Sequence, residues 1–108
     1  KALILGITFK ENCPDIRNTR VVDIYHELLT YGMEVDVFDP WANAEEVKHE
    51  YGINVLTKYP EGNGYNAIIL AVAHEDFKSN DIKAHKQNGA IIYDVKGILP
   101  KEMVNARL

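Results

Sequence analysis

The sequence predicts an α/β protein in which a mostly parallel, five-stranded sheet lies between two layers of helices. Short apolar runs alternate along the chain with segments of helical hydrophobic periodicity, which is the pattern of βαβ units. Several of these runs are continuously apolar, as expected for strands buried on both faces of a parallel sheet. Because crossovers in such sheets are right-handed, we expect a three-layer α/β/α Rossmann-like sandwich with strand order 3-2-1-4-5.

Five segments are predicted to be strands because they are rich in apolar and β-branched residues. They are residues 2–5, 34–38, 53–56, 67–72 and 90–95. The first, fourth and fifth are continuous apolar runs without polar alternation. We therefore expect these three strands to be buried on both faces.

Two helices are predicted after the first two strands. The first is expected to be capped by Asn18 or Thr19 and to end at Gly32, with its apolar residues on one face. Asn43 is expected to cap the second helix, which ends at Gly52. The first turn of that helix is acidic, as the helix dipole favours.

The second half of the chain is less regular. The turn-rich residues 57–65 take the place of a helix between the third and fourth strands. A short third helix is predicted to begin at Ser79 or Asp81 and to end before Gly89. Residues 101–108 are predicted to start a fourth helix.

The composition indicates a single soluble domain that spans residues 1–108. A formal net charge of −4 argues against a nucleic-acid partner held by a general basic field. The longest apolar run, residues 67–73, is too short to cross a membrane. Cys13 is the single cysteine, which excludes an internal disulfide and fits a reducing, cytoplasmic compartment. Because Lys1 directly precedes a strand, we expect the chain to be part of a longer protein.

Candidate functional residues gather where the first, fourth and fifth strands end. In an open parallel sheet, ligands bind beyond the carboxyl ends of the strands, near the point where the strand order reverses. The segments that leave these strands carry Lys10, Arg17, His74, Glu75, Asp94 and Lys96. Lys10 and Arg17 share one long loop before a helix N-terminus, so they favour an anion site, with phosphate as the natural ligand. The alternative for any single lysine is a solvated loop residue.

Other kinds of site have weaker signals in the same region. The turn after the first strand contains only Gly6 and lacks G-x-G-x-x-G, the fingerprint of a dinucleotide site. Asp39 is therefore interpreted as part of a strand-ending turn and not as a ribose ligand. Cys13 has no histidine nearby in the sequence and is interpreted as a packing residue. His74 has two open interpretations, loop ordering and acid–base chemistry, and Trp41 either packs or covers an interface.

Three stretches of the sequence resemble a known family. They are "GITFKENCPDIRNTRVVDI", "GMEVDVFDPWA" and "YDVKGIL". The pattern resembles the C-terminal, UDP-sugar-binding domain of the UDP-glucose/GDP-mannose dehydrogenase family. Within the family it is most similar to bacterial dehydrogenases of UDP-N-acetylhexosamines such as UDP-N-acetylgalactosamine. Such enzymes oxidise C6 of a nucleotide sugar from alcohol to carboxylate and reduce two NAD.

The resemblance implies that this chain is the last domain of such a dehydrogenase and is not catalytic alone. Phe9 and Lys10 would contact the nucleotide sugar, with Lys10 near the diphosphate or sugar. Arg17 would reach across the cleft to the pyrophosphate of NAD, which the absent N-terminal domain mainly binds. Lys96 would lie against the nucleotide, although relatives place two successive arginines there. Cys13 does not match the family's catalytic cysteine, and the full-length enzyme is expected to be a homodimer or larger.

A second hypothesis is a non-catalytic Rossmann-like module that binds a nucleotide or mediates assembly. This module would bind its ligand with useful affinity without another domain. The dehydrogenase hypothesis expects weak binding by the chain alone, because half of the contacts are missing. Neither hypothesis involves a metal, a nucleic acid or a membrane, and the sequence leaves open which sugar is oxidised.

Overall fold

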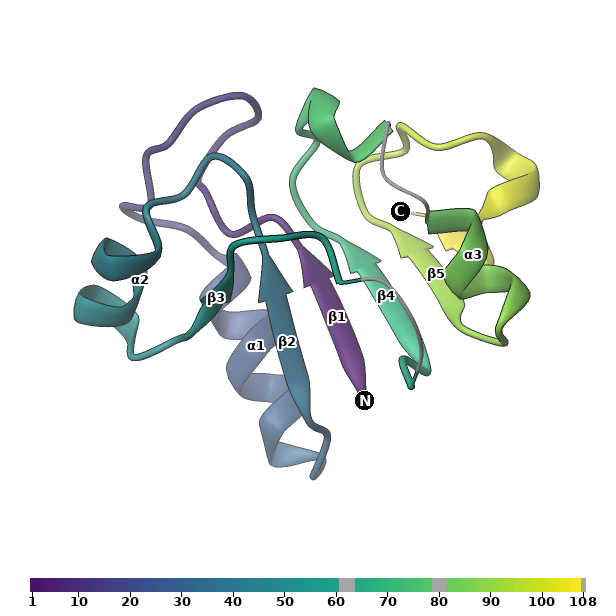
Figure 1. Ribbon diagram of the computed structural model, residues 1–108, viewed down its shortest axis with the longest axis horizontal. Coiled ribbons are helices and arrows are strands. Elements are labelled where there is room, and N and C mark those ends of the chain that lie inside the picture. The colour runs from purple at the N-terminus through teal and green to yellow at the C-terminus, as the bar shows by residue number, and fades with distance from the viewer. Residues whose placement is uncertain (61–63, 79–81, 108) are drawn as a thin grey trace.

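The computed structural model describes residues 1–60, 64–78 and 82–107 and contains one six-stranded sheet (Figure 1). All neighbouring strands are parallel. The order is β3-β2-β1-β4-β5-β6, which confirms the predicted order 3-2-1-4-5 and adds a sixth strand at one edge. The strands are β1 Ala2–Leu5, β2 Val35–Phe38, β3 Val55–Leu56, β4 Ala67–Leu70, β5 Ile91–Asp94 and β6 Ala106–Arg107.

The prediction of a fourth helix in residues 101–108 is wrong. The chain makes only a short 3₁₀ turn, η2 (Lys101–Met103), before it joins the sheet as β6. Asn105 attaches the start of β6 to β5. Its backbone N–H donates to the Ile92 carbonyl at 2.8 Å, and its Oδ1 accepts from the Ile92 N–H at 2.9 Å. These bonds satisfy backbone groups on the edge of β5, whereas so short a helix would be marginal.

The two helices predicted in the first half are present as α1 (Val21–Thr30) and α2 (Ala44–Tyr51). Asn43 caps α2 as predicted, because its side chain accepts hydrogen bonds from two N–H groups of the first turn. At α1, the Thr19 hydroxyl accepts a hydrogen bond from the first helical N–H at 3.2 Å. Asn18 instead has a positive φ of 58° and lies outside the helix.

The connection between β4 and β5 contains a 3₁₀ turn, η1 (Glu75–Lys78), and the short helix α3 (Ile82–Gln87). The helix ends before Gly89, as predicted. The predicted caps Ser79 and Asp81 lie outside the described residues. Within the described parts of the chain, no helix is long and apolar enough to span a membrane.

The sheet separates two apolar cores, which confirms the three-layer prediction. On the face covered by α1 and α2 the core consists of Ile4, Ile7, Ile16, Val21, Val37, Val47, Ile53, Val55, Ala71 and Val72. On the face covered by η1 and α3 it consists of Leu3, Leu5, Phe38, Tyr65, Ile68, Leu70, Phe77, Ile82, Ala90, Ile92 and Leu99. In Figure 1, α1 lies behind the sheet and α3 in front of it. Because β1 supplies side chains to both cores, its sequence is apolar at every position.

Candidate functional site

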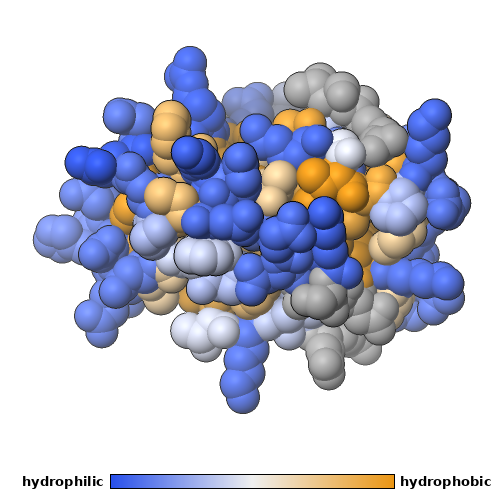
Figure 2. Space-filling view, turned by 90° about the horizontal axis from the view of Figure 1, so that it is seen from above, coloured by the Kyte–Doolittle hydropathy of each residue, from blue (hydrophilic) through white to orange (hydrophobic). Residues whose placement is uncertain are grey.

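The carboxyl ends of β1, β4 and β5 lie at the upper edge of the sheet in Figure 1. A small pocket is lined by residues that follow these three strands. Its volume is about 220 Å³, and it is bordered by the β1–α1 loop, the start of α1 and the exits of β4 and β5. Hydrophilic side chains cover much of this edge when it is seen from above (Figure 2). Three of the predicted site residues, Phe9, Lys10 and Lys96, line the pocket together.

Arg20 is a third cation of this pocket, and the sequence analysis missed it. It directly precedes α1, where a positive charge opposes the helix dipole. Its guanidinium is 3.8 Å from the Asp23 carboxylate, but both side chains are mostly exposed, so solvent weakens this pair. A basic residue directly before a predicted helix was a usable signal, because together with Lys10 and Lys96 it suits an anionic ligand.

Lys96 is positioned by a turn built around Asp94. The Asp94 side chain is fully buried. Its Oδ1 accepts hydrogen bonds from the N–H groups of Lys96 at 3.0 Å and Gly97 at 2.7 Å, and its Oδ2 accepts from Leu99 at 2.8 Å. Asp94 therefore orders the exit of β5 and does not face a ligand, while the Lys96 side chain remains exposed.

Asp39 orders the loop that carries Lys10. Its Oδ2 accepts hydrogen bonds from Ile7 N–H at 2.7 Å and Thr8 N–H at 3.1 Å. Its Oδ1 accepts from Trp41 N–H at 2.8 Å, which confirms the predicted turn at the end of β2. Burial acts to raise the pKa of Asp39, but hydrogen bonds from His74 and Ile7 outweigh burial and hold this pKa below its ordinary value.

The structure favours loop ordering over acid–base chemistry for His74. Its side chain is fully buried and lies 3.0 Å from the carboxylate of Asp39. The Trp41 ring stacks on it at a centroid distance of 6.1 Å and is itself 40% exposed. Glu75 is exposed, and Cys13 is a partly exposed free thiol. In the part of the chain that the structure describes, no group of histidine, cysteine and acidic side chains could hold a metal ion.

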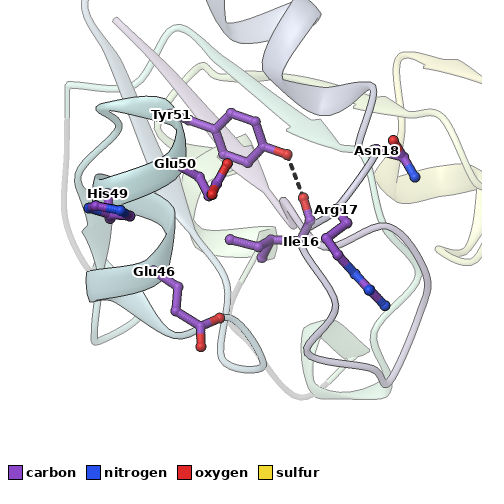
Figure 3. A pocket seen from close by; sticks show the side chains of 7 residues that line it. All are labelled: Ile16, Arg17, Asn18, Glu46, His49, Glu50 and Tyr51. Carbon is purple, nitrogen blue, oxygen red and sulfur yellow. Dashed lines mark hydrogen bonds between the residues drawn. The ribbon is translucent and has the colours of Figure 1, made fainter.

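Arg17 lies outside the pocket of Lys10 and borders a different pocket. Its guanidinium donates two hydrogen bonds to Asp15, at 3.0 and 3.1 Å. This contact lowers the pKa of Asp15 and raises that of Arg17. Tyr51 of α2 fixes the neighbouring backbone, since its hydroxyl donates to the Ile16 carbonyl at 2.6 Å. Figure 3 shows this loop across from Glu46, His49 and Glu50.

The described residues do not fit a dinucleotide site. Gly6 has a φ of +98°, and a Cβ at this position would lie 2.5 Å from the Cβ of Val72. This glycine therefore allows the exits of β1 and β4 to pack closely. Asp39, at the position of a ribose-binding acid, is 3% exposed and already accepts hydrogen bonds with both oxygens. The side chain of Arg17, the residue predicted to contact NAD, is 84% exposed.

The fold and the site define a Rossmann-like α/β domain with a cationic pocket and without the dinucleotide fingerprint. Residues 3–101 match the family model for the UDP binding domain of the UDP-glucose/GDP-mannose dehydrogenase family. The chain belongs to this family.

Curated relatives agree with the predicted subgroup of UDP-N-acetylhexosamine dehydrogenases. The chain is 50% identical over 109 residues to the UDP-N-acetyl-D-glucosamine 6-dehydrogenase of Salmonella typhi. It is 47% identical over 111 residues to the enzyme of the same name from Pseudomonas aeruginosa. These alignments cover 98% and 100% of this chain but only 25% and 26% of the relatives. The chain thus spans about a quarter of the length of the curated relatives that it matches.

Solved structures confirm the fold. The UDP-glucose dehydrogenase of Pyrobaculum islandicum superposes with a TM-score of 0.73 at 22% identity, covering 98% of this chain and 24% of that chain. The UDP-D-ManNAc dehydrogenase of Pyrococcus horikoshii gives 0.72 at 21% identity, with coverage of 98% and 24%.

Proposed function

We propose that this chain is the UDP-sugar-binding domain of a longer, NAD-dependent UDP-sugar 6-dehydrogenase. In the proposed reaction, the C6 alcohol of a UDP-N-acetylhexosamine becomes a carboxylate while two NAD are reduced and one water is consumed. The observation that carries the proposal is the pocket that joins Phe9, Lys10 and Lys96 in a member of this family. The names of the relatives from Salmonella typhi and Pseudomonas aeruginosa support the substrate class.

The size and charge of the pocket suit one part of a nucleotide sugar. Its volume of about 220 Å³ is below the roughly 300–1,000 Å³ that is typical of small-molecule sites. We therefore assign half of the site to this chain and the rest to other domains of the enzyme. Lys10 and Lys96 would neutralise the diphosphate, and the ring of Phe9, which is 60% exposed, would contact the nucleotide sugar.

Arg17 lies outside the pocket of Lys10, which suits contact with a second ligand, NAD. Its side chain is 84% exposed and lines another pocket, so it would contact the pyrophosphate of NAD held by another domain. The homodimeric or larger assembly and the cytoplasmic location belong to the same proposal. The family resemblance supports the assembly, and the single cysteine supports the location.

Steady-state kinetics of the complete enzyme with UDP-N-acetylglucosamine and NAD test the proposal. Lys10→Ala should lower kcat/KM for the sugar about 10-fold or more, because a hydrogen bond to a charged group contributes about 1.5–3 kcal/mol. Arg17→Ala should mainly raise the KM for NAD. Lys48→Ala, which removes an exposed lysine of α2, is the matched control and should change neither value.

Three results would count against these assignments. Unchanged kinetics of Lys10→Ala would remove Lys10 from the site. A wild-type enzyme that forms no NADH with any UDP-sugar, or that forms fewer than two per sugar oxidised, would refute the proposed reaction. Micromolar binding of UDP by the 108-residue chain alone would instead favour an independent binding module.

A further inference from the structure

The buried His74, just after β4, makes hydrogen bonds with the segment that carries Lys10. Its Nδ1 accepts a hydrogen bond from the Asn12 N–H at 2.8 Å, so the proton of the neutral ring is assigned to Nε2. The Nε2–H group lies 3.0 Å from Asp39 Oδ2 and also 3.0 Å from Thr8 Oγ1. One imidazole therefore binds both ends of the segment from residue 8 to residue 12.

Thr8 and Asn12 hold the backbone on either side of Lys10. The Thr8 hydroxyl donates a hydrogen bond to the Lys10 carbonyl at 3.0 Å. Asn12 has a φ of 53°, which is uncommon for a residue other than glycine, and its Oδ1 accepts from the Glu75 N–H at 3.0 Å. The backbone around Lys10 is thus attached to the β4 exit, while the Lys10 side chain stays exposed at the pocket.

Two aromatic rings shield His74 from solvent. The rings of Trp41 and Phe77 lie 6.1 and 5.3 Å from the imidazole between centroids. Trp41 is itself held by Asp76, whose carboxylate accepts the indole N–H at 2.9 Å. In such a buried environment a hydrogen bond is stronger, and leaving either partner unsatisfied is costly.

We propose that His74 is a positioning residue of the UDP-sugar site, which sets the place of Lys10 through its hydrogen bond with Asn12. The inference rests on the proposed function. A cation that is already in place when the ligand arrives loses less conformational freedom on binding, so the affinity is higher. A histidine with only a structural role would change stability without changing the KM for the sugar.

Two substitutions separate the contacts of the ring. In His74→Asn, Oδ1 occupies the place of Nδ1 and keeps the acceptor for the Asn12 N–H. In His74→Gln, the amide nitrogen occupies the place of Nε2, so the contact with Asp39 remains and the acceptor for Asn12 is lost. In the complete enzyme, we expect His74→Gln to raise the KM for UDP-N-acetylglucosamine about fivefold or more, with the KM for NAD unchanged. His74→Asn should stay within about twofold of the wild type.

A second pair keeps the test decisive if a His74 variant does not fold. Thr8→Val removes the hydroxyl that donates to Lys10, and Thr8→Ser keeps it. A higher KM in Thr8→Val that is restored in Thr8→Ser supports the inference. With an active wild type, a KM for the sugar that is unchanged in His74→Gln or, where that variant does not fold, in Thr8→Val overturns the inference alone, even where the melting temperature falls. An inactive wild type would overturn the proposed function and, with it, this inference.

Discussion

Replacing Gly6 by alanine should destabilise the fold strongly, because the exits of β1 and β4 leave no space for a methyl group. The added Cβ would lie 2.5 Å from Val72 Cβ, 2.8 Å from Val72 Cγ2 and 3.0 Å from the Val72 nitrogen. Since carbon atoms in good contact are about 3.5–4.0 Å apart, the overlap with Cβ is about 1 Å. The φ of +98° adds strain for any residue with a side chain.

The two effects together give the expected magnitude. A positive φ costs a residue other than glycine about 1–2 kcal/mol, and overpacking costs about 1–3 kcal/mol. The free energy of unfolding should therefore fall by about 2–5 kcal/mol, a large part of the roughly 5–15 kcal/mol of a typical domain. For a chain of this length, the melting temperature should fall by roughly 8–20 °C. Thermal unfolding followed by circular dichroism measures this change.

Gly89→Ala is the matched control, because it isolates the backbone strain from the collision. Gly89 has a φ of +99°, but nothing lies within 4 Å of the Cβ position. We expect this variant to lose only about 1–2 kcal/mol. Equal losses in the two variants would refute the collision with Val72, and a Gly6→Ala protein as stable as the wild type would refute the whole argument.

Two further predictions concern the buried acids. The pKa of Asp39 is lowered in the folded protein, so its carboxylate stabilises the fold above about pH 4, and this contribution is lost as the pH falls through the lowered pKa. Asp39→Asn should therefore lose about 2–4 kcal/mol at pH 7 and show a weaker acid dependence of unfolding than the wild type; parallel curves would contradict this. Asp94→Ala should lose about 2–4 kcal/mol and expose the N–H groups of Lys96 and Leu99 to faster hydrogen exchange, whereas Asp94→Asn keeps one acceptor and should lose less. Unchanged exchange at these two groups in Asp94→Ala would exclude the turn as their source of protection.

The central part of the fold could be predicted from local patterns, whereas its edge could not. Strands buried on both faces leave continuous apolar runs, and short connections with right-handed crossovers fix their order. The strand β6 has only two residues and therefore no periodicity of its own. Its place depends on the pairing of Asn105 with Ile92, which lie 13 residues apart in the sequence. Such a pairing is decided by the unpaired edge of β5 and not by local propensity.

The same distinction applies to the candidate site. The proximity of Lys10 and Lys96 could be predicted from the sequence, because the carboxyl ends of parallel strands share one edge of the sheet. The separation of Arg17 from Lys10 could not be predicted in this way. It follows from the ion pair between Arg17 and Asp15 and from the hydrogen bond of Tyr51 to the loop backbone. Spacing along a loop says little about where its side chains point until its partners elsewhere in the chain are known.

The long loop after β1 shows why this sheet can carry a binding residue without a glycine-rich turn. A loop of this length must find partners for its backbone groups, or it would not be ordered. Asp39 and His74 supply them from the exits of two other strands, and the His74–Asn12 contact joins residues 62 apart in the sequence. Because buried side chains bind the backbone, Phe9 and Lys10 are free to face the pocket. The buried side chains of Asp39 and His74 therefore order this loop. The affinity for a ligand should depend on these two residues, although neither would contact the ligand.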